Sequence, residues 1–149
     1  MMIVRFAHDL MTDTATTKPK PLILYVDDER GNRVVFEQSL SSEFALKIAS
    51  DAKTALEILE QHEIALIVTD MRMPTMNGEE LLRIVKERHP QVIRMVMTAY
   101  SDIEPILRAI NEGLVARYIV KPWVRAEPQA GTDHGKIHGG RRHQIHSEL

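Results

Sequence analysis

The feature that most constrains the fold of this chain is an alternation of two hydrophobic periods along its middle. Short apolar runs are separated by segments whose apolar residues recur at three- and four-residue intervals, a spacing typical of helices. Strands that alternate with helices form β-α-β units, and near-continuous apolar strands are typical of a parallel sheet covered on both faces. We therefore predict one α/β domain with five parallel strands: Leu22–Val26, Phe44–Ala49, Ile64–Thr69, Val92–Thr98 and Ala116–Val120.

Individual residues mark the boundaries of the predicted helices. Asp51 is a suitable N-cap, and Pro90 ends a helical segment because it lacks a backbone N–H. Pro105 is tolerated in a first turn, and Gly113 can take the left-handed conformation that ends a helix. These signals predict four helical segments, which are Asn32–Leu40, Ala52–Leu59, Glu79–His89 and Asp102–Asn111.

The composition excludes several classes of protein. The 149 residues include no cysteine, which excludes a disulfide scaffold, a thiolate metal site and a cysteine nucleophile. The net charge of −2 gives no basic excess, so we expect no direct DNA binding. No apolar run approaches the roughly 20 residues of a membrane span, and residues 1–10 lack the apolar stretch of a signal peptide. We therefore expect a cytoplasmic protein with no membrane partner.

The two ends of the chain differ in composition from its middle. Residues 1–21 include a polar, threonine-rich stretch and are expected to form a flexible leader, with Met11 as an alternative start. Residues 22–123 form the predicted domain, with 12 basic against 16 acidic side chains and a net charge of −4. Residues 124–149 hold four of the seven glycines and four of the seven histidines. Disorder is expected there rather than a histidine metal site, because no apolar period continues.

Polar residues stand at the carboxyl ends of four predicted strands. Asp27 and Asp28 follow the first strand, Asp70 follows the third, Thr98 ends the fourth and Lys121 follows the fifth. In an open α/β sheet the functional crevice lies outside this edge. Each residue alone has a plain structural explanation, such as a solvated loop acid or a surface charge. Their convergence at one edge indicates a site.

Three carboxylates at close range repel one another and raise each other's pKa unless a cation lies among them. Mg²⁺ is the natural ion, because it takes one or two carboxylates and keeps water or phosphate in its remaining positions. A lysine beside such a cluster pairs with a further anion, and a threonine hydroxyl donates a hydrogen bond to it. The sequence therefore predicts a Mg²⁺ site that handles a phosphoryl group.

Four segments resemble the CheY-like receiver domain of two-component response regulators, in the order and spacing of that family. The resemblance covers residues 22–123 and lies in LILYVDDE, LIVTDMRMPTMNG, RMVMTAYSD and RYIVKPW. It implies a doubly wound, five-stranded parallel sheet of the flavodoxin-like receiver type. It also implies a phosphoacceptor domain of a phosphorelay. Such a domain receives its phosphoryl group from a histidine kinase or phosphotransfer protein, and it drives only its own phosphorylation and dephosphorylation.

The resemblance implies a role for each matching residue around the site. Asp70 corresponds to the phosphoacceptor, a carboxylate nucleophile that forms an aspartyl phosphate. Asp28 would bind Mg²⁺ directly and Asp27 largely through water. Asp70 and the backbone carbonyl of Arg72 would complete the protein ligands. Lys121 would pair with the phosphoryl oxygens.

The resemblance also implies a conformational switch. Thr98 would hydrogen-bond a phosphoryl oxygen, and Tyr118, at the aromatic position of the family, would rotate into the space that Thr98 leaves. Pro74 and Gly78 match the loop that shapes the approach to the next helix, and Pro122 matches the turn after the lysine. Simple packing is the alternative role for Tyr118.

The family has a fifth helix after its last strand, and here that pattern stops. The chain continues as KPWVRAE, as such a helix should, but Pro128 and Gly131 then break the pattern. We therefore expect the fifth helix to be missing, shortened or irregular, and we hypothesise a reading-frame change near Glu127. Without that helix one face of the sheet would expose apolar area, which predicts low stability and self-association.

Two other functions are compatible with the same fold. A pseudo-receiver, which binds proteins without being phosphorylated, is disfavoured because the chain retains the three aspartates, the threonine and the lysine. A small phosphatase with an aspartyl nucleophile would need a general acid near Asp70, and Met71, Arg72 and Met73 supply no carboxylate. The phosphoacceptor function is therefore the leading prediction.

Overall fold

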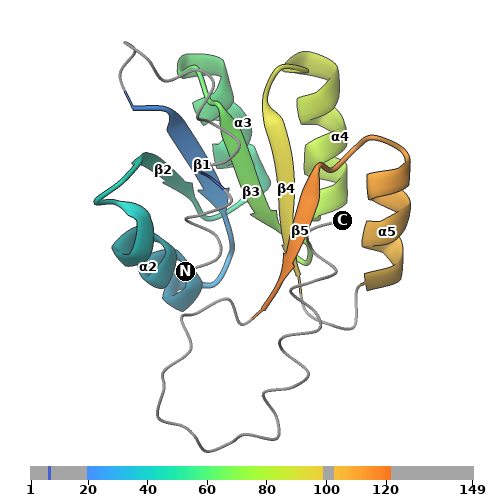
Figure 1. Ribbon diagram of the computed structural model, residues 1–149, viewed down its shortest axis with the longest axis horizontal. Helices are drawn as coiled ribbons and strands as arrows, with labels where there is room; N and C mark the ends of the chain where they lie inside the picture. Colours follow the sequence, from blue (N-terminus) through green and yellow to red (C-terminus); the bar gives the residue numbers. More distant parts are fainter. Residues whose placement is uncertain (1–6, 8–19, 99–102, 122–149) are drawn as a thin grey trace, which may run out of the picture.

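The computed structural model describes Ala7, residues 20–98 and residues 103–121. Strands and helices alternate along the chain, as Figure 1 shows. In chain order the elements are β1 (Leu22–Val26), α2 (Arg30–Leu40), β2 (Ala45–Ala49), α3 (Ala52–Gln61), β3 (Leu66–Asp70), α4 (Gly78–Arg88), β4 (Ile93–Thr98), α5 (Ile103–Asn111) and β5 (Arg117–Val120).

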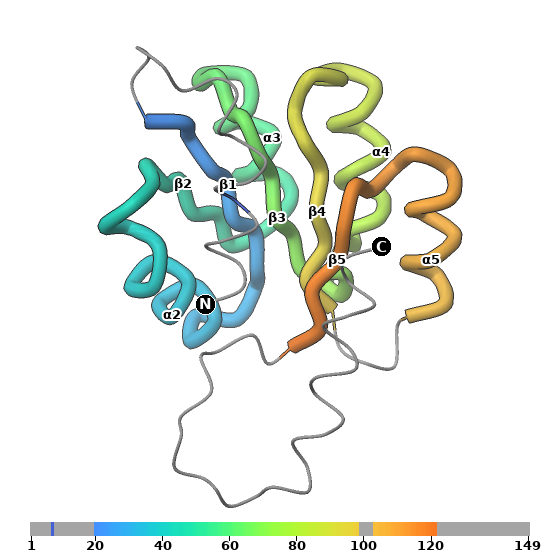
Figure 2. The backbone as a smooth tube through the Cα atoms, in the orientation of Figure 1, coloured from blue at the N-terminus to red at the C-terminus, as the bar shows by residue number. Residues whose placement is uncertain are grey.

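The five strands form one parallel sheet in the order β2-β1-β3-β4-β5 (Figure 2). The chain moves outward from β1 to β2, returns to β3 on the other side of β1, and continues through β4 to the opposite edge at β5. The strand order therefore reverses between β1 and β3, which is where open α/β sheets place their ligands. The predicted doubly wound parallel sheet is confirmed.

The two faces of the sheet carry different numbers of described helices. Helices α3, α4 and α5 cover one face, here called the three-helix face, with Ala55, Leu82 and Ile106 in its core. Helix α2 packs on the other face, here called the α2 face, through Phe36 and Leu40. Among the described helices α2 alone packs there, chiefly against β1 and β2.

Local sequence explains where the helices begin and end. Asp51 accepts a hydrogen bond from the backbone N–H of Thr54 at 2.8 Å, which confirms its predicted role as an N-cap. Asn77 and Glu80 form a capping box at the start of α4. Gly113 has a φ of +80° just after α5, as predicted for a helix stop. All elements begin and end within two residues of their predicted ranges.

The described part of the chain ends with Lys121, and no helix follows β5 within it. The fifth helix, which was expected to be missing, shortened or irregular, would begin beyond Lys121 and therefore lies outside the described residues. Pro122, the tail 124–149 and most of the leader 1–21 lie outside the described residues. No described helix is both long and apolar enough to span a bilayer.

Candidate functional site

The candidate site lies at the carboxyl edge of the sheet. Asp27 follows β1, Asp70 is the last residue of β3, and Thr98 is the last residue of β4. Lys121 follows β5, and its backbone N–H donates to the carbonyl oxygen of Thr98 at 2.8 Å. Because the strands are parallel, these ends all lie on one side. Asp27, Asp70 and Thr98 are buried, whereas Asp28 is exposed.

Three carboxylates form an acid cluster, defined here as Asp27, Asp28 and Asp70. One oxygen from each lies within 4.8 Å of the other two. The ammonium group of Lys121 lies 3.0 Å from Oδ1 of Asp70 and 3.7 Å from Oδ2 of Asp27. The structure thus brings these four residues together, and the two buried carboxylates share one ammonium group.

Burial and charge shift the protonation of the central pair, Asp70 and Lys121. Burial raises the pKa of the Asp70 carboxyl above its ordinary value; the hydrogen bond from Lys121 opposes this shift and the charge of Asp27 adds to it. For Lys121, burial disfavours the ammonium form, but the hydrogen bond to Asp70 and the surrounding carboxylates together raise its pKa. Lys121 therefore stays protonated, while Asp70 ionises against a desolvation cost that a divalent cation would reduce.

The carboxylate of Asp27 is held by hydrogen bonds to both of its oxygens. Oδ1 accepts from the backbone N–H of Glu29 at 2.9 Å. Oδ2 accepts from the hydroxyl of Tyr25 at 2.7 Å and from Nδ2 of Asn32 at 3.1 Å. These donors occupy lone pairs that a metal would use, which favours a water-mediated contact between Asp27 and an ion.

Tyr25 is a site residue that the sequence analysis did not identify. Its ring is fully buried and stacks on Phe36, with centroids 4.0 Å apart and ring planes at 3°. Burial, together with the charge of Asp27, raises the pKa of the Tyr25 hydroxyl well above its ordinary value, so the group remains a donor. A signal for this contact was present, because residues two apart in extended backbone project to the same side.

A glycine brings the loop after β3 close to Asp70. The backbone N–H of Gly78 donates to the carbonyl oxygen of Met71 at 2.8 Å, which holds the first residue of α4 against the end of β3. A Cβ on Gly78 would overlap the carbonyl oxygen of Asp70. Thr75 takes a φ of +70°, which is uncommon for a residue other than glycine. The expected role of Gly78 in shaping this loop therefore has a steric basis.

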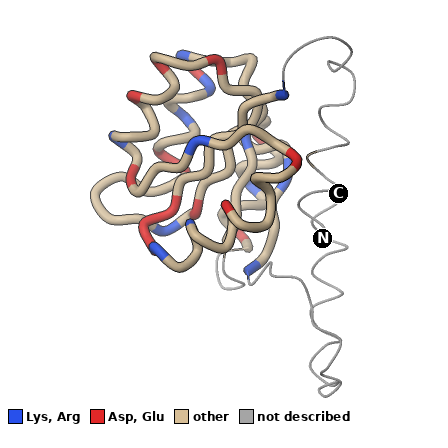
Figure 3. The backbone as a smooth tube through the Cα atoms, turned by 90° about the vertical axis from the view of Figure 1, so that its left-hand side faces the viewer, with Lys and Arg blue, Asp and Glu red and all other residues tan. Residues whose placement is uncertain are grey.

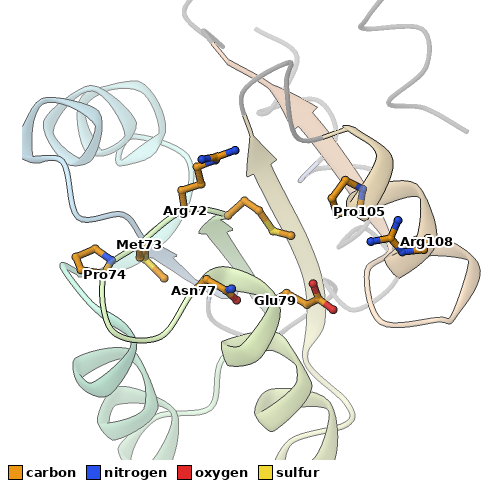
Figure 4. Close-up of a pocket in the computed structure, with 8 residues that line it drawn as sticks. Arg72, Met73, Pro74, Asn77, Glu79, Pro105 and Arg108 are labelled. Atoms are coloured by element: carbon orange, nitrogen blue, oxygen red, sulfur yellow. The ribbon is translucent and has the colours of Figure 1, made fainter.

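A cavity of about 640 Å³ lies along the loop that follows Asp70. Its lining residues come from the loop that directly follows Asp70, from the start of α4 and from α5, as Figure 4 shows. Arg72 of the loop and Arg108 of α5 both line it, and Arg72 is exposed. Two cationic side chains, Arg72 and Arg108, and the carboxylate of Glu79 therefore line one cavity along the loop after Asp70.

The two expected switch residues occupy different positions in the sheet. Thr98 is fully buried at the end of β4 and pairs with Val120 of β5. Tyr118 pairs with Val96, two residues farther from the carboxyl edge, and is 3% exposed in the core of the three-helix face. Thr98 thus lies at the edge that carries Asp70, and Tyr118 lies behind it.

The acid cluster has the chemistry and spacing of a site for a hard divalent cation. Mg²⁺ binds oxygen at about 2.0–2.1 Å, so opposite ligands of one ion are about 4 Å apart. The three carboxylate oxygens, all within 4.8 Å of one another, are close to this separation. Figure 3 shows that positions of both signs of charge are spread along the described backbone.

The chain is similar in sequence to proteins of one family, the response regulators. The family model of the response regulator receiver domain matches residues 23–130. The hydrogenase transcriptional regulatory protein HoxA of Cupriavidus necator is 37% identical over 102 residues, which are 68% of this chain and 21% of HoxA. The DNA-binding transcriptional regulator NtrC of Escherichia coli is 31% identical over 103 residues, which are 68% of this chain and 22% of NtrC. The chain thus spans about a fifth of the length of these relatives.

Solved structures give the same result. The signal receiver domain of an HD domain-containing protein from Pseudomonas fluorescens matches with a TM-score of 0.66 at 30% identity, covering 87% of this chain and 98% of that one. A response regulator receiver domain protein from Clostridium thermocellum matches with a TM-score of 0.66 at 25% identity, covering 84% and 98%. The fold, the acid cluster beside its lysine and these matches together show that the chain belongs to the response regulator receiver domain family, whose members are signalling domains that typically use Mg²⁺ at an aspartate cluster and interact with histidine kinases.

Proposed function

We propose that this domain is a phosphorylation switch in which Asp70 accepts a phosphoryl group. The observation that carries the proposal is the 3.0 Å contact between Oδ1 of Asp70 and Nζ of Lys121 within the acid cluster. An oxygen of Asp70 attacks phosphorus, the bond from phosphorus to the leaving group of the donor breaks, and an acyl phosphate remains. The ammonium group of Lys121 neutralises charge on the transferred group, and no further base is needed.

The acid cluster supports Mg²⁺ as the ion that this reaction requires. Asp28 and Asp70 would hold it directly, Asp27 would hold it through water, and the backbone carbonyl of Arg72 would complete the protein ligands. When bound, Mg²⁺ supplies positive charge that offsets the charge developing on the phosphoryl oxygens. The hydrogen bonds to both oxygens of Asp27 support its indirect role.

The modified Asp70 would bias a two-state element formed by Thr98 and Tyr118. A phosphoryl group adds negative charge and acceptor oxygens at the edge where the Thr98 side chain is buried. Movement of Thr98 toward the phosphoryl group vacates space, and Tyr118 rotates into it. Two packings that differ by a few kcal/mol are sufficient for a signalling switch.

We propose a histidine kinase or a phosphotransfer protein as the phosphodonor, approaching over the loop after β3. Arg72 and Arg108 would attract anionic groups of the donor from the cavity that they line. The domain would not contact DNA directly, because the net charge of −4 over residues 22–123 is repelled by a duplex. We propose that the domain acts in the cytoplasm. Its downstream target would be a protein.

Intact-mass measurement after incubation with Mg²⁺ and acetyl phosphate tests this proposal. We expect a gain of one phosphoryl group that is lost in Asp70→Asn and retained in Glu57→Gln, a matched acid-to-amide change at an exposed position of α3. Lys121→Met removes the charge that neutralises the transferred group and should slow the reaction about 100-fold.

Two outcomes of the same experiment would contradict the proposal. No gain in mass with any donor would support a phosphorylation-independent interaction module, or pseudo-receiver. Rapid multiple turnover of phosphate esters would indicate a small phosphatase.

A further inference from the structure

Three uncharged donors hold the carboxylate of Asp27 in one orientation. They are the hydroxyl of Tyr25, the side-chain amide of Asn32 and the backbone N–H of Glu29, at 2.7, 3.1 and 2.9 Å. The first two donate to Oδ2 and the third donates to Oδ1. Each carboxylate oxygen has about two lone-pair sites. Within the described residues, Oδ2 is therefore filled, and Oδ1 keeps one site for a further donor.

The amide of Asn32 can face its neighbours in one way only. Nδ2 lies 3.1 Å from Oδ2 of Asp27 and 2.8 Å from Oε1 of Glu29, so its two hydrogens bond two carboxylates. A reversed amide would point its oxygen at these two acceptors and lose both bonds. Glu29 is the N-cap of α2, and its side chain makes no capping bond. Its carboxylate instead fixes the rotation of the amide.

Helix α2 fixes the backbone from which Asn32 projects. Phe36 lies one turn farther along the same side of α2, and its ring stacks on Tyr25 with centroids 4.0 Å apart. Arg33, also in α2, donates from Nη1 to the carbonyl oxygen of Asp27 at 2.9 Å. The helix therefore holds the backbone of Asp27 directly and its carboxylate through Asn32 and Tyr25.

The neutral amide of Asn32 leaves the charge of the site unchanged. Three ionised carboxylates and the ammonium group of Lys121 give a net charge of −2, which matches a divalent cation. The guanidinium group of Arg33 and the carboxylate of Glu29 both lie near Asp27 and offset each other. A cationic side chain in place of Asn32 could also bind Asp27, but it would cancel one unit of the charge that attracts the ion.

We propose that Asn32 is a positioning residue of the cation site, which turns Asp27 so that the remaining site of Oδ1 is available to the water shell of a bound ion. This inference rests on the proposed function, because it takes Mg²⁺ as the ion of the acid cluster. Asn32 does not touch the ion and acts through Asp27. Residues that orient a metal ligand in this way typically contribute roughly 10- to 100-fold to metal affinity.

Calorimetric titration with MgCl₂, without any phosphodonor, tests the role of Asn32. Asn32→Leu removes both donors, keeps a similar volume and changes no charge. We expect the dissociation constant for Mg²⁺ to rise about tenfold. Gln38→Leu is the matched control, because it makes the same kind of change at an exposed position of α2. Equal dissociation constants for the two variants would overturn the proposal.

A second measurement separates positioning from a general loss of structure. The rate of phosphorylation by acetyl phosphate is followed by intact mass at rising Mg²⁺ concentration. Asn32→Leu should need about tenfold more Mg²⁺ for its half-maximal rate and should reach the maximal rate of the original chain. A maximal rate that stays low at saturating Mg²⁺ would show a structural role and overturn the proposal. If Asn32→Leu does not fold, Asn32→Ala is compared with Gln38→Ala, because alanine is the best helix former.

These results also distinguish the inference from the proposed function. If the original chain binds no Mg²⁺, the proposed function loses its ion, and the role of Asn32 is wrong with it. If the original chain binds Mg²⁺ and gains a phosphoryl group while Asn32→Leu behaves like Gln38→Leu, the proposed function stands and only the role of Asn32 is overturned.

Discussion

The two faces of the sheet bury their strand residues equally well with unequal sets of described elements. On the three-helix face, Ile67 and Val96 are 0% and 1% exposed beneath α3, α4 and α5. On the α2 face, Val68 and Met97 are both 0% exposed, although the described cover consists of α2 and Ala7. A parallel sheet is stable only when both faces are covered. Within the described residues, the strands of the α2 face are therefore as deeply buried as those of the three-helix face.

The two faces also bring one tyrosine each toward the candidate site. Tyr25 on the α2 face is fixed at both ends, by its stack on Phe36 and its hydrogen bond to Asp27. Tyr118 on the three-helix face lies in the core behind Thr98 and is the residue that we propose to move. The α2 face thus anchors the acid cluster, and the three-helix face is the proposed route of the signal.

The largest expected effects come from truncating one buried leucine on each face. Leu82→Ala on α4 and Leu40→Ala on α2 each remove a fully buried side chain and should each lower the free energy of unfolding by about 3 kcal/mol. Urea denaturation of both variants measures the two losses. A loss for Leu40→Ala of less than half that for Leu82→Ala would show that the α2 face is loosely covered, and the equivalence of the faces would be wrong.

Two glycine substitutions should have effects of opposite sign. Gly78→Ala in α4 forces the backbone of Asp70 to shift and should destabilise the fold by about 1–3 kcal/mol. Gly31→Ala in α2 meets nothing within 4 Å and should stabilise it by about 0.5 kcal/mol, because alanine is the better helix former. The urea midpoints of the two variants test this contrast. Equal midpoints would mean that the contact between Gly78 and Asp70 imposes no constraint.

Removing the hydroxyl of Tyr25 should weaken the anchor on the α2 face. Tyr25→Phe keeps the ring that stacks on Phe36 but leaves Asp27 with one donor fewer, which should cost about 1 kcal/mol. The Mg²⁺ dependence of the thermal midpoint should also change, because Asp27 is less firmly held. Tyr118→Phe is the matched control and should leave that dependence intact. If the Mg²⁺ dependence of the thermal midpoint changes in Tyr118→Phe but not in Tyr25→Phe, the three-helix face and not the α2 face anchors the acid cluster.

The smallest expected effect is a pH dependence of the free energy of unfolding, to which Asp70 and Asp51 contribute with opposite signs. The folded pKa of Asp70 is raised, so the folded state binds more protons, and ionisation of Asp70 costs stability as pH rises from its ordinary pKa through the folded one. Above this window Asp70→Asn should be more stable than the original chain, and Mg²⁺ should reduce the difference.

Asp51 is the control for this experiment. Its pKa is lowered by the hydrogen bonds from Thr54, so its contribution to stability is gained as pH rises from the folded pKa to the ordinary one. Unfolding free energies measured from about pH 3 to pH 7 compare each asparagine variant with the original chain, a range that brackets ordinary aspartate pKa values. The same sign for both aspartates would contradict the assigned burial of Asp70.

Much of the fold could be predicted because its determinants are local. The strand and helix periods gave every element to within two residues, and Asp51 and Gly113 act at the helix ends where expected. The site could be predicted in part, because polar residues at the carboxyl ends of parallel strands must meet at one edge. The support of Asp27 by Tyr25 and Asn32 was not predicted, since it depends on how α2 lies against β1.

The sequence by itself determined the order of strands and helices and placed the acids and the lysine at one edge of the sheet. The tertiary structure alone decided that the ammonium group of Lys121 lies near both Asp27 and Asp70, and that Gly78 packs against the backbone of Asp70. It also decided that Ala7 belongs to the core of the α2 face. Periodicity and capping act between residues close in sequence, and a local pattern records them. Burial and charge sharing depend on what lies across the packed interior, and no local pattern specifies that.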